Sequence, residues 1–288
     1  MMTLDQRIEF DIKERLAGGS LSGAELLSPA IKMNSDEATE GFSTLGLPGY
    51  YCGNRDAKTV VVNLNPGMDA QLADCLWGCR TVSFNHSSLA SFVNDFNDYS
   101  KKYGAIDKTR YDSFDIKQAA FFYSWENSGI GLPMMPPKGW EDKDFCLNAK
   151  EAVLMNKLQL ELIPYSSSKF TIDKRQIGLF FPYVETLLNE IFRKEREYVV
   201  FASAIFEDIF KAYNNNYLLN SNEVKFTLKK KDGTNMRSQL KCRKITLSYN
   251  GKEQKALIAH SFPSQSIGRA FDIMQQYGAF CYNEYIKP

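Results

Sequence analysis

The sequence predicts an α/β fold: a three-layer α/β/α sandwich around a central four-stranded parallel sheet, with an antiparallel hairpin added to the sheet. Two observations predict it. Four short runs rich in strand-favouring residues recur along the chain, at 59–65, 157–163, 197–203 and 255–261. Helical patterns lie between and after these runs, and a strand–helix–strand order implies right-handed crossovers with helices on both faces of a parallel sheet.

Each element has its own pattern. The first run, TVVVNLN, and the third, EYVVFAS, are nearly continuous apolar segments, as expected of strands buried on both faces. The segment 175–196 places apolar side chains on one helical face, and Pro182 within it either kinks the helix or marks its first turn. Two further helices are expected after the third and fourth runs, at 204–213 and 266–285.

Two regions do not fit this alternating scheme. Residues 222–250 have the pattern of a strand meander, with hairpin turns expected at the Asp-Gly and Asn-Gly pairs 232–233 and 250–251. We place the meander as an antiparallel addition before the fourth core strand. Residues 66–150 are long and irregular in pattern, and ordered loops of this kind usually carry function or pack over it.

Composition indicates a globular protein without a membrane segment. The 288 residues are 44% hydrophobic and 24% charged, which is ordinary for a globular chain. No stretch reaches the roughly 18 uninterrupted apolar residues of a membrane span, and the charged N-terminal segment lacks the apolar core of a signal peptide. Six thinly spread cysteines indicate free thiols in a reducing compartment. We expect a cytoplasmic monomer with a single domain over 1–288, on which a helical segment 1–50 packs.

Charge does not select a partner or a metal. The formal net charge is +1, although local Lys and Arg patches can still bind phosphates. Basic residues flank the expected hairpin at 229–231 and 241–244, where they either contact phosphates or guard the edge of a solvated ribbon. Cys75, Cys79 and His86 have metal-compatible side chains, but no fourth ligand is evident and the spacing fits no common zinc site. We therefore expect no metal.

Polar residues collect just beyond the expected strands, at the edge where an open parallel sheet binds its ligands. In the turn Asn65-Pro66-Gly67, proline and glycine hold the Asn65 side chain rigidly at the strand end, where it can orient a water molecule. A neutral His260 imidazole can donate to an oxygen that gains negative charge as a bond breaks. Each also has an ordinary alternative: a strand-ending turn for the first, and a hydrogen-bonded structural histidine for the second.

Together these segments resemble the uracil-DNA glycosylase superfamily. Its first motif, G-x-N-P-G in the mismatch-specific and single-strand-selective branches, corresponds to N-L-N-P-G at 63–67. Its second motif, commonly H-P-S-P after the last core strand, corresponds to H-S-F-P at 260–263. The order of strands and motifs matches the superfamily across roughly residues 55–285.

The resemblance implies a DNA glycosylase, which flips a damaged or mismatched base into a pocket and hydrolyses its N-glycosidic bond without a metal or cofactor. Asn65 would then align the attacking water, and His260 would stabilise the departing base. Pro66 and Gly67 would contact the substrate beside Asn65. The implied partner is DNA.

The resemblance nominates other positions less directly. The aromatic side chain that stacks on the base lies after the first motif, which nominates Trp77 or Phe84; each is alternatively a core aromatic. The bulky wedge that fills the gap left by a flipped base is Ser264 here, which is too small for that role. Phe262, inside the same loop, is the candidate substitute for the wedge.

Glu161 stands where the superfamily usually carries the asparagine that reads the pyrimidine edge. A carboxylate accepts hydrogen bonds but cannot supply the donor that an amide gives to a carbonyl. Glu161 therefore either accepts from an N–H or exocyclic amine of another base, or merely packs with its head paired. These departures leave two alternatives open: a non-catalytic nucleic-acid- or nucleobase-binding protein on a glycosylase scaffold, and a hydrolase of small N-glycosides.

Overall fold

The computed structural model forms two compact units. It describes residues 2–33, 42, 48–64, 88–106, 113–165, 167, 170–213, 218–229, 234–262 and 270–287. The first unit comprises Met1–Cys52, Asn63–Lys102 and Gln159–Lys194; the second comprises Gly53–Val62, Tyr103–Leu158 and Glu195–Pro288. The single domain expected from the sequence stays a prediction. Among the described helices, none has both the length and the apolar character needed to cross a membrane.

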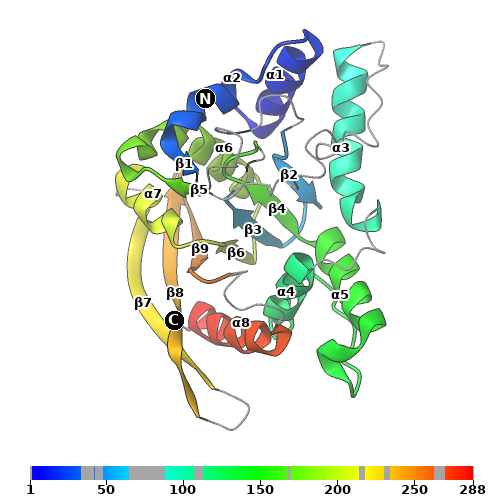
Figure 1. Ribbon diagram of the computed structural model, residues 1–288, viewed down its shortest axis with the longest axis vertical. Coiled ribbons are helices and arrows are strands. Elements are labelled where there is room, and N and C mark those ends of the chain that lie inside the picture. The colour runs from blue at the N-terminus through cyan, green and yellow to red at the C-terminus, as the bar shows by residue number, and fades with distance from the viewer. Residues whose placement is uncertain are drawn as a thin grey trace. The chain divides into compact units, whose positions relative to one another are not determined.

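Seven strands form a mixed sheet in the order β2-β4-β3-β6-β9-β8-β7 (Figure 1). Their bounds are β2 Tyr51–Gly53, β3 Thr59–Asn63, β4 Leu158–Glu161, β6 Tyr198–Phe201, β7 Leu218–Lys229, β8 Asn235–Tyr249 and β9 Lys252–Ala259. The four runs predicted from the sequence are β3, β4, β6 and β9, and β6 pairs in parallel with both β3 and β9. The sequence did not predict the edge strand β2.

The parallel strands of the second unit end level with one another. Val62 of β3 lies opposite Phe201 of β6, and the same pair of strands continues with a hydrogen bond of 2.8 Å from the Ala202 amide to the Val62 carbonyl. On the other side of β6, Phe201 lies opposite Ile258 of β9. The carboxyl ends of three strands therefore share one edge of this sheet, as the sequence predicts for the ligand-binding edge.

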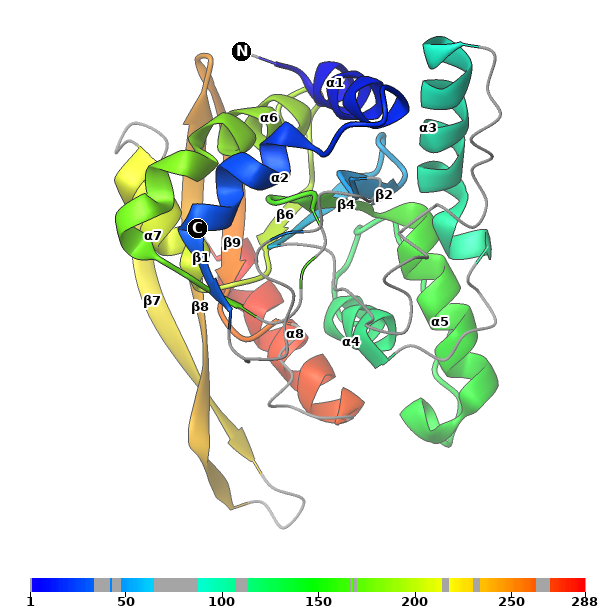
Figure 2. The same cartoon turned by 45° about the horizontal axis from the view of Figure 1, so that its top comes forward.

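Helices cover both faces of the sheet in the second unit (Figure 2). They are α4 Ser113–Phe122, the 3₁₀ helix η3 Gly139–Glu141, α5 Lys143–Asn156, α7 Ile205–Tyr213 and α8 Phe271–Ile286. Val200 of β6 faces a core shared with α4, α5 and α8. The next residue, Phe201, points to the opposite face, where its ring centroid lies 5.0 Å from those of Phe206 and Phe210 in α7.

β7 and β8 form the predicted antiparallel hairpin, and β8 continues into β9 through a tight turn. Asn250 and Gly251 make that turn with φ of 51° and 74°, left-handed values that an Asn-Gly pair adopts readily. One face of the β7–β8 ribbon packs on α8, where the rings of Phe226 and Phe280 stack with centroids 4.9 Å apart. The other predicted turn, 232–233, lies outside the described residues.

The first unit contains the N-terminal helices and the segment that follows β4. Its further elements are α1 Leu4–Leu16, α2 Ser22–Leu27, η1 Ser28–Ala30, β1 Ile31–Met33, most of α3 Leu89–Ile106, β5 Phe170–Ile172, η4 Lys174–Phe180 and α6 Phe181–Ile191. Thr3 and Gln6 close α1 with a reciprocal capping box. Arg7 of α1 donates to the hydroxyl of Thr186 in α6 at 2.7 Å, so the helical N-terminal segment packs on this unit.

The region 66–150 was predicted to be irregular, but its described part contains the helices α3, α4 and α5. Most side chains of α4 are buried, so no alternation of polar and apolar faces marks its period. Asp142 caps α5, because its carboxylate accepts a hydrogen bond of 2.9 Å from the Phe145 amide. Pro182 lies in the first turn of α6, after the 3₁₀ helix η4, so it marks a helix start.

Candidate functional site

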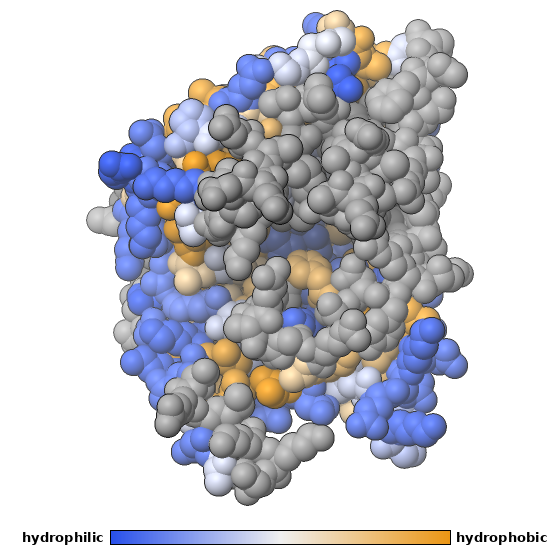
Figure 3. All heavy atoms as spheres, viewed as in Figure 1, coloured by the Kyte–Doolittle hydropathy of each residue, from blue (hydrophilic) through white to orange (hydrophobic). Residues whose placement is uncertain are grey.

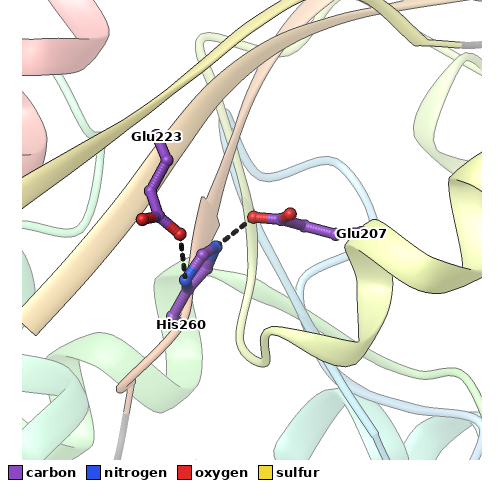
Figure 4. A group of neighbouring side chains, drawn as sticks. All are labelled: Glu207, Glu223 and His260. Atoms are coloured by element: carbon purple, nitrogen blue, oxygen red, sulfur yellow. Dashed lines mark ion pairs between the residues drawn. The ribbon is translucent and has the colours of Figure 1, made fainter.

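Three elements of the second unit bring Glu207, Glu223 and His260 together (Figure 4). Glu207 lies in the first turn of α7, Glu223 lies on β7, and His260 directly follows β9. The His260 amide donates to the Lys241 carbonyl at 3.1 Å, so pairing with β8 fixes the backbone at this position. Because the preceding residue, Ala259, belongs to the core on α4 and α8, the His260 side chain points to the opposite face, which α7 covers.

Both ring nitrogens of His260 face carboxylate oxygens. Nε2 forms an ion pair with Oε1 of Glu207, and Nδ1 lies 3.9 Å from Oε2 of Glu223. The His260 and Glu207 side chains are 10% and 11% exposed, whereas that of Glu223 is 28% exposed. Each ring nitrogen of His260 therefore has a carboxylate beside it.

Two basic side chains of β8 balance these carboxylates. Nε of Arg243 donates to Oε1 of Glu207 at 2.8 Å, and Nζ of Lys241 lies 3.1 Å from Oε1 of Glu223. The hydrogen bond from Lys241 is the main reason that the pKa of Glu223 lies below its ordinary value. The cluster is thus a network of alternating acidic and basic groups around one histidine.

The same three groups carry side chains that can bind metals. In the described part of the chain, the ligand atoms of Glu207, Glu223 and His260 lie within 4.8 Å of one another. The geometry does not suit a single ion, because the two carboxylates approach opposite nitrogens of one ring (Figure 4). Arg243 and Lys241 already supply positive charge to both carboxylates. We interpret the cluster as an ion-pair network.

A second polar group, in the first unit, contains Glu161. Nδ2 of Asn63 donates to Oε1 of Glu161 at 3.2 Å, and Nε2 of Gln159 donates to the same oxygen at 2.8 Å. Asn63 and Glu161 are both buried. Oδ1 of Asn63 has no hydrogen-bond partner among the described residues. Oε1 of Glu161 is therefore paired with two donors, while Asn63 retains a buried acceptor.

Phe262, the candidate wedge, is buried in the second unit. Its ring centroid lies 4.2 Å from that of Phe121 and 6.1 Å from that of Phe122, both in α4. With 3% of its surface exposed, the ring belongs to the hydrophobic core. In this arrangement Phe262 does not present an exposed apolar surface to a nucleic acid.

The remaining residues expected at the site lie outside the described part of the chain. They are Asn65, Pro66, Gly67, Trp77, Phe84 and Ser264. The metal-compatible side chains considered in the sequence, Cys75, Cys79 and His86, also lie outside it. Their roles stay predictions from the motifs.

The sequence analysis did not place Glu207, Glu223 or Arg243 beside His260, although it considered the basic residues at 241–244 as phosphate contacts. Glu207 follows β6 within the first turn of the next helix, so extending the search at the carboxyl edge by one helical turn would have found it. Glu223 and Arg243 give no comparable signal. They lie directly opposite each other only because of the register between β7 and β8, which two short bulges shift.

A buried group in the first unit joins one acid to three tyrosines. The hydroxyls of Tyr50 and Tyr165 donate to Oδ2 of Asp11 at 2.8 and 2.9 Å, and the hydroxyls of Tyr165 and Tyr183 are 3.0 Å apart. Burial raises the pKa of Asp11 to about 6, although both hydrogen bonds act to lower it. Because Asp11 is 2% exposed, we assign this group to folding and not to catalysis.

Comparison with known proteins does not assign a family. No protein-family model, curated protein or solved structure matches the chain.

Proposed function

We propose that this chain is a DNA N-glycosylase that hydrolyses the N-glycosidic bond of a flipped damaged or mismatched base. The observation that carries the proposal is the common level of Val62, Phe201 and Ile258 at the carboxyl ends of β3, β6 and β9. In the sequence, the turn 65–67 begins two residues after β3, and His260 directly follows β9. The common level supports the proposal because both motifs start from one edge of the same parallel strands.

The strands that carry the two motifs lie close together. Neighbouring strands lie about 4.8 Å apart, so β3 and β9, which flank β6, are separated by about 10 Å. In the proposed reaction, Asn65 aligns water for attack on the sugar carbon, and His260 donates to the departing base. Trp77 or Phe84 stacks on that base.

The groups on Asn63 and Glu161 favour a base that presents donors. Oδ1 of Asn63 is a buried acceptor with no partner among the described residues, and the Glu161 carboxylate only accepts when ionised. The carbonyl oxygens of uracil need a donor, which Glu161 does not supply. We therefore propose that the recognised base carries an exocyclic amine or an additional N–H.

A second candidate function is a non-catalytic nucleic-acid- or nucleobase-binding protein on the same scaffold. The contacts of His260 with Glu207 and Glu223 favour it, because a ring that faces carboxylates on both sides is not free to donate to a departing base. Catalysis requires the ring to exchange one of these contacts for the substrate. The two functions therefore differ in what happens at His260 when DNA binds.

Base excision from labelled oligonucleotides tests the proposal. The single- and double-stranded substrates carry uracil, hypoxanthine, xanthine or mismatched thymine. Asn65→Ala and His260→Ala are each expected to lower the single-turnover excision rate by about 100-fold, because each removes a group that acts in the transition state. Asn148→Ala is the matched control, since Asn148 is exposed on α5, and it should excise at the wild-type rate.

Each outcome separates the candidates. Excision that the Asn65 and His260 variants weaken and the control preserves would establish a glycosylase and identify its base. DNA binding without excision would favour the non-catalytic function. Excision that survives both substitutions unchanged would refute the assigned roles of Asn65 and His260.

A further inference from the structure

Two lysines lie directly opposite each other on the β7–β8 ribbon. Lys225 of β7 pairs in register with Lys241 of β8. Lys225 is exposed, and the Lys241 side chain is 41% exposed. Like charges directly opposite each other on a sheet destabilise it. The ion pair of Lys241 with Glu223 offsets part of this repulsion, and an anion bound beside Lys225 and Lys241 would offset the rest.

The alternation of side chains shows which face carries this pair. Val224 lies opposite Cys242, and Phe226 lies opposite Leu240; these four side chains pack toward the core on α8. The residues between them point to the other face of the ribbon. There the register sets three pairs side by side: Glu223 with Arg243, Lys225 with Lys241, and Thr227 with Gln239.

This second face, here called the polar ribbon face, is defined by those six residues and carries more basic than acidic side chains. Lys225, Lys241 and Arg243 outnumber the one acid, Glu223. Lys241 pairs with Glu223 and Arg243 pairs with Glu207 of α7, so a surplus of one positive charge remains when Glu207 is included. The face is continuous with the proposed site, because His260 contacts Glu223 and its amide bonds to the Lys241 carbonyl. Hydrophilic residues also gather over α7 and the neighbouring part of β7 (Figure 3).

We propose that the polar ribbon face binds the phosphate backbone of the DNA whose base enters the proposed site. The inference rests on the proposed function for the identity of the polyanion. A two-stranded antiparallel ribbon fits the major groove of B-DNA. Lysine ammonium groups bind phosphates as point charges, and each phosphate neutralised releases condensed counterions. The ribbon thus positions the duplex or single strand next to His260 without reading its sequence.

Salt-dependent binding of DNA without a lesion tests this inference separately from catalysis. The affinity of fluorescein-labelled duplex and single-stranded oligonucleotides is measured by anisotropy at several salt concentrations. Lys225→Gln combined with Lys241→Gln is expected to weaken duplex binding about 10-fold or more at moderate salt. It should also reduce the slope of log K against log salt by about 2, roughly 1 for each lost phosphate contact.

The matched control removes the same charge elsewhere. Lys138 and Lys143 are exposed near the start of α5, and the double variant Lys138→Gln/Lys143→Gln should keep the wild-type affinity and salt slope. Lys225→Gln alone should reduce the slope by about 1 while leaving the Lys241–Glu223 pair intact. Circular dichroism and thermal melting of each variant confirm that the fold is retained.

The failures of the two proposals are distinguishable. Lysine-dependent DNA binding without excision at any base refutes the glycosylase and leaves the ribbon interface standing. Excision by a protein whose DNA affinity and salt slope are unchanged in the Lys225/Lys241 double variant refutes the ribbon interface alone. Wild-type protein that binds neither duplex nor single strand at low salt refutes both.

Discussion

The side-chain amide of Asn63 donates a hydrogen bond of 3.2 Å to Oε1 of Glu161. In the superfamily that the sequence resembles, a glycine usually stands at the position of Asn63 and an asparagine at the position of Glu161. The two departures are therefore one interacting pair, in which the residue that replaces glycine supplies a donor to the residue that replaces asparagine. Gln159 adds a second donor to the same oxygen. A paired substitution of this kind gives one oxygen of a buried carboxylate two donors and changes what the site can recognise.

Asn63→Ala is expected to destabilise the protein by about 1–3 kcal/mol, because it takes one donor from a buried carboxylate. Urea unfolding measures the change in the free energy of unfolding. Asn148→Ala, on the exposed face of α5, serves as the control and should stay within about 0.5 kcal/mol of the wild type. A loss at Asn63 no larger than that of the control would show that this hydrogen bond contributes little.

Restoring the motif pattern with Asn63→Gly and Glu161→Asn should move base preference toward uracil if the proposed function holds. The asparagine supplies the donor that a carbonyl oxygen requires, and the glycine removes the side chain that pairs with position 161. The ratio of single-turnover excision rates for uracil and hypoxanthine measures the preference. A ratio that stays at the wild-type value would place base recognition elsewhere than at Glu161.

The two carboxylates beside His260 should differ in their contribution to stability. The Glu207 side chain is 11% exposed and contacts both His260 and Arg243. Glu207→Ala removes the carboxylate from these two largely buried side chains, so it should lower the free energy of unfolding by about 2–3 kcal/mol. Glu223 is 28% exposed and its partner Lys241 is 41% exposed, so Glu223→Ala should cost below about 1 kcal/mol. Denaturant unfolding of both variants tests this order. Equal losses would mean that the burial of Glu207 does not strengthen its ion pairs.

Asp11 should make the stability fall as pH rises through the acid range. Burial raises its pKa to about 6 in the folded protein, above the ordinary value of 3.8 expected in the unfolded chain. Between these values the folded state keeps a proton that the unfolded state releases, so the contribution is complete below about pH 4 and is lost as pH rises to about 6. At about 1.36 kcal/mol for each pKa unit, the difference amounts to about 3 kcal/mol.

Asp11→Asn should remove this dependence, because the amide oxygen can accept the same hydrogen bonds from Tyr50 and Tyr165. Comparing both proteins by urea unfolding at pH 4 and pH 7 cancels the contributions of all other titrating groups. From about pH 4 to pH 7, the free energy of unfolding of the wild type should fall by about 3 kcal/mol relative to that of the variant. Parallel pH profiles would show that Asp11 titrates normally.

The sequence predicted the elements whose patterns are local. β3 and β6 are buried on both faces and so appear as continuous apolar runs, and the Asn-Gly pair at 250–251 specifies its turn through left-handed φ values. β2, with three residues, is too short to give a pattern. α4 was missed because a helix buried on most sides has no polar face.

The candidate site was predictable only in part, for a similar reason. His260 stands at a strand end and is visible from the sequence, but its contacts with Glu207 and Glu223 depend on helix packing and on the β7–β8 register. The pairing of Glu161 with Asn63 likewise joins residues on different strands. Such long-range contacts decide whether a polar side chain is available to a ligand, and no single-sequence pattern encodes them.

Gly278, in the middle of α8, should not tolerate even a methyl group. In an open helix, replacing glycine with alanine gains about 1 kcal/mol from helix propensity. Here a Cβ at position 278 would collide with the backbone carbonyl of Phe121 in α4, and the Gly278 carbonyl itself accepts a hydrogen bond of 3.0 Å from Trp125. Neither helix can shift without disturbing the core between them, so Gly278→Ala should destabilise by about 3 kcal/mol.

Gly251→Ala provides the comparison for this close approach. Its Cβ would meet open space, but its φ of 74° is unfavourable for alanine, so the expected loss is about 1 kcal/mol from backbone strain alone. Thermal or urea unfolding of both variants measures the two losses. A Gly278→Ala protein as stable as the wild type would mean that α4 and α8 do not approach each other this closely at Gly278 and Phe121. The core between these helices, which supports β9 and His260, would then be less tightly packed.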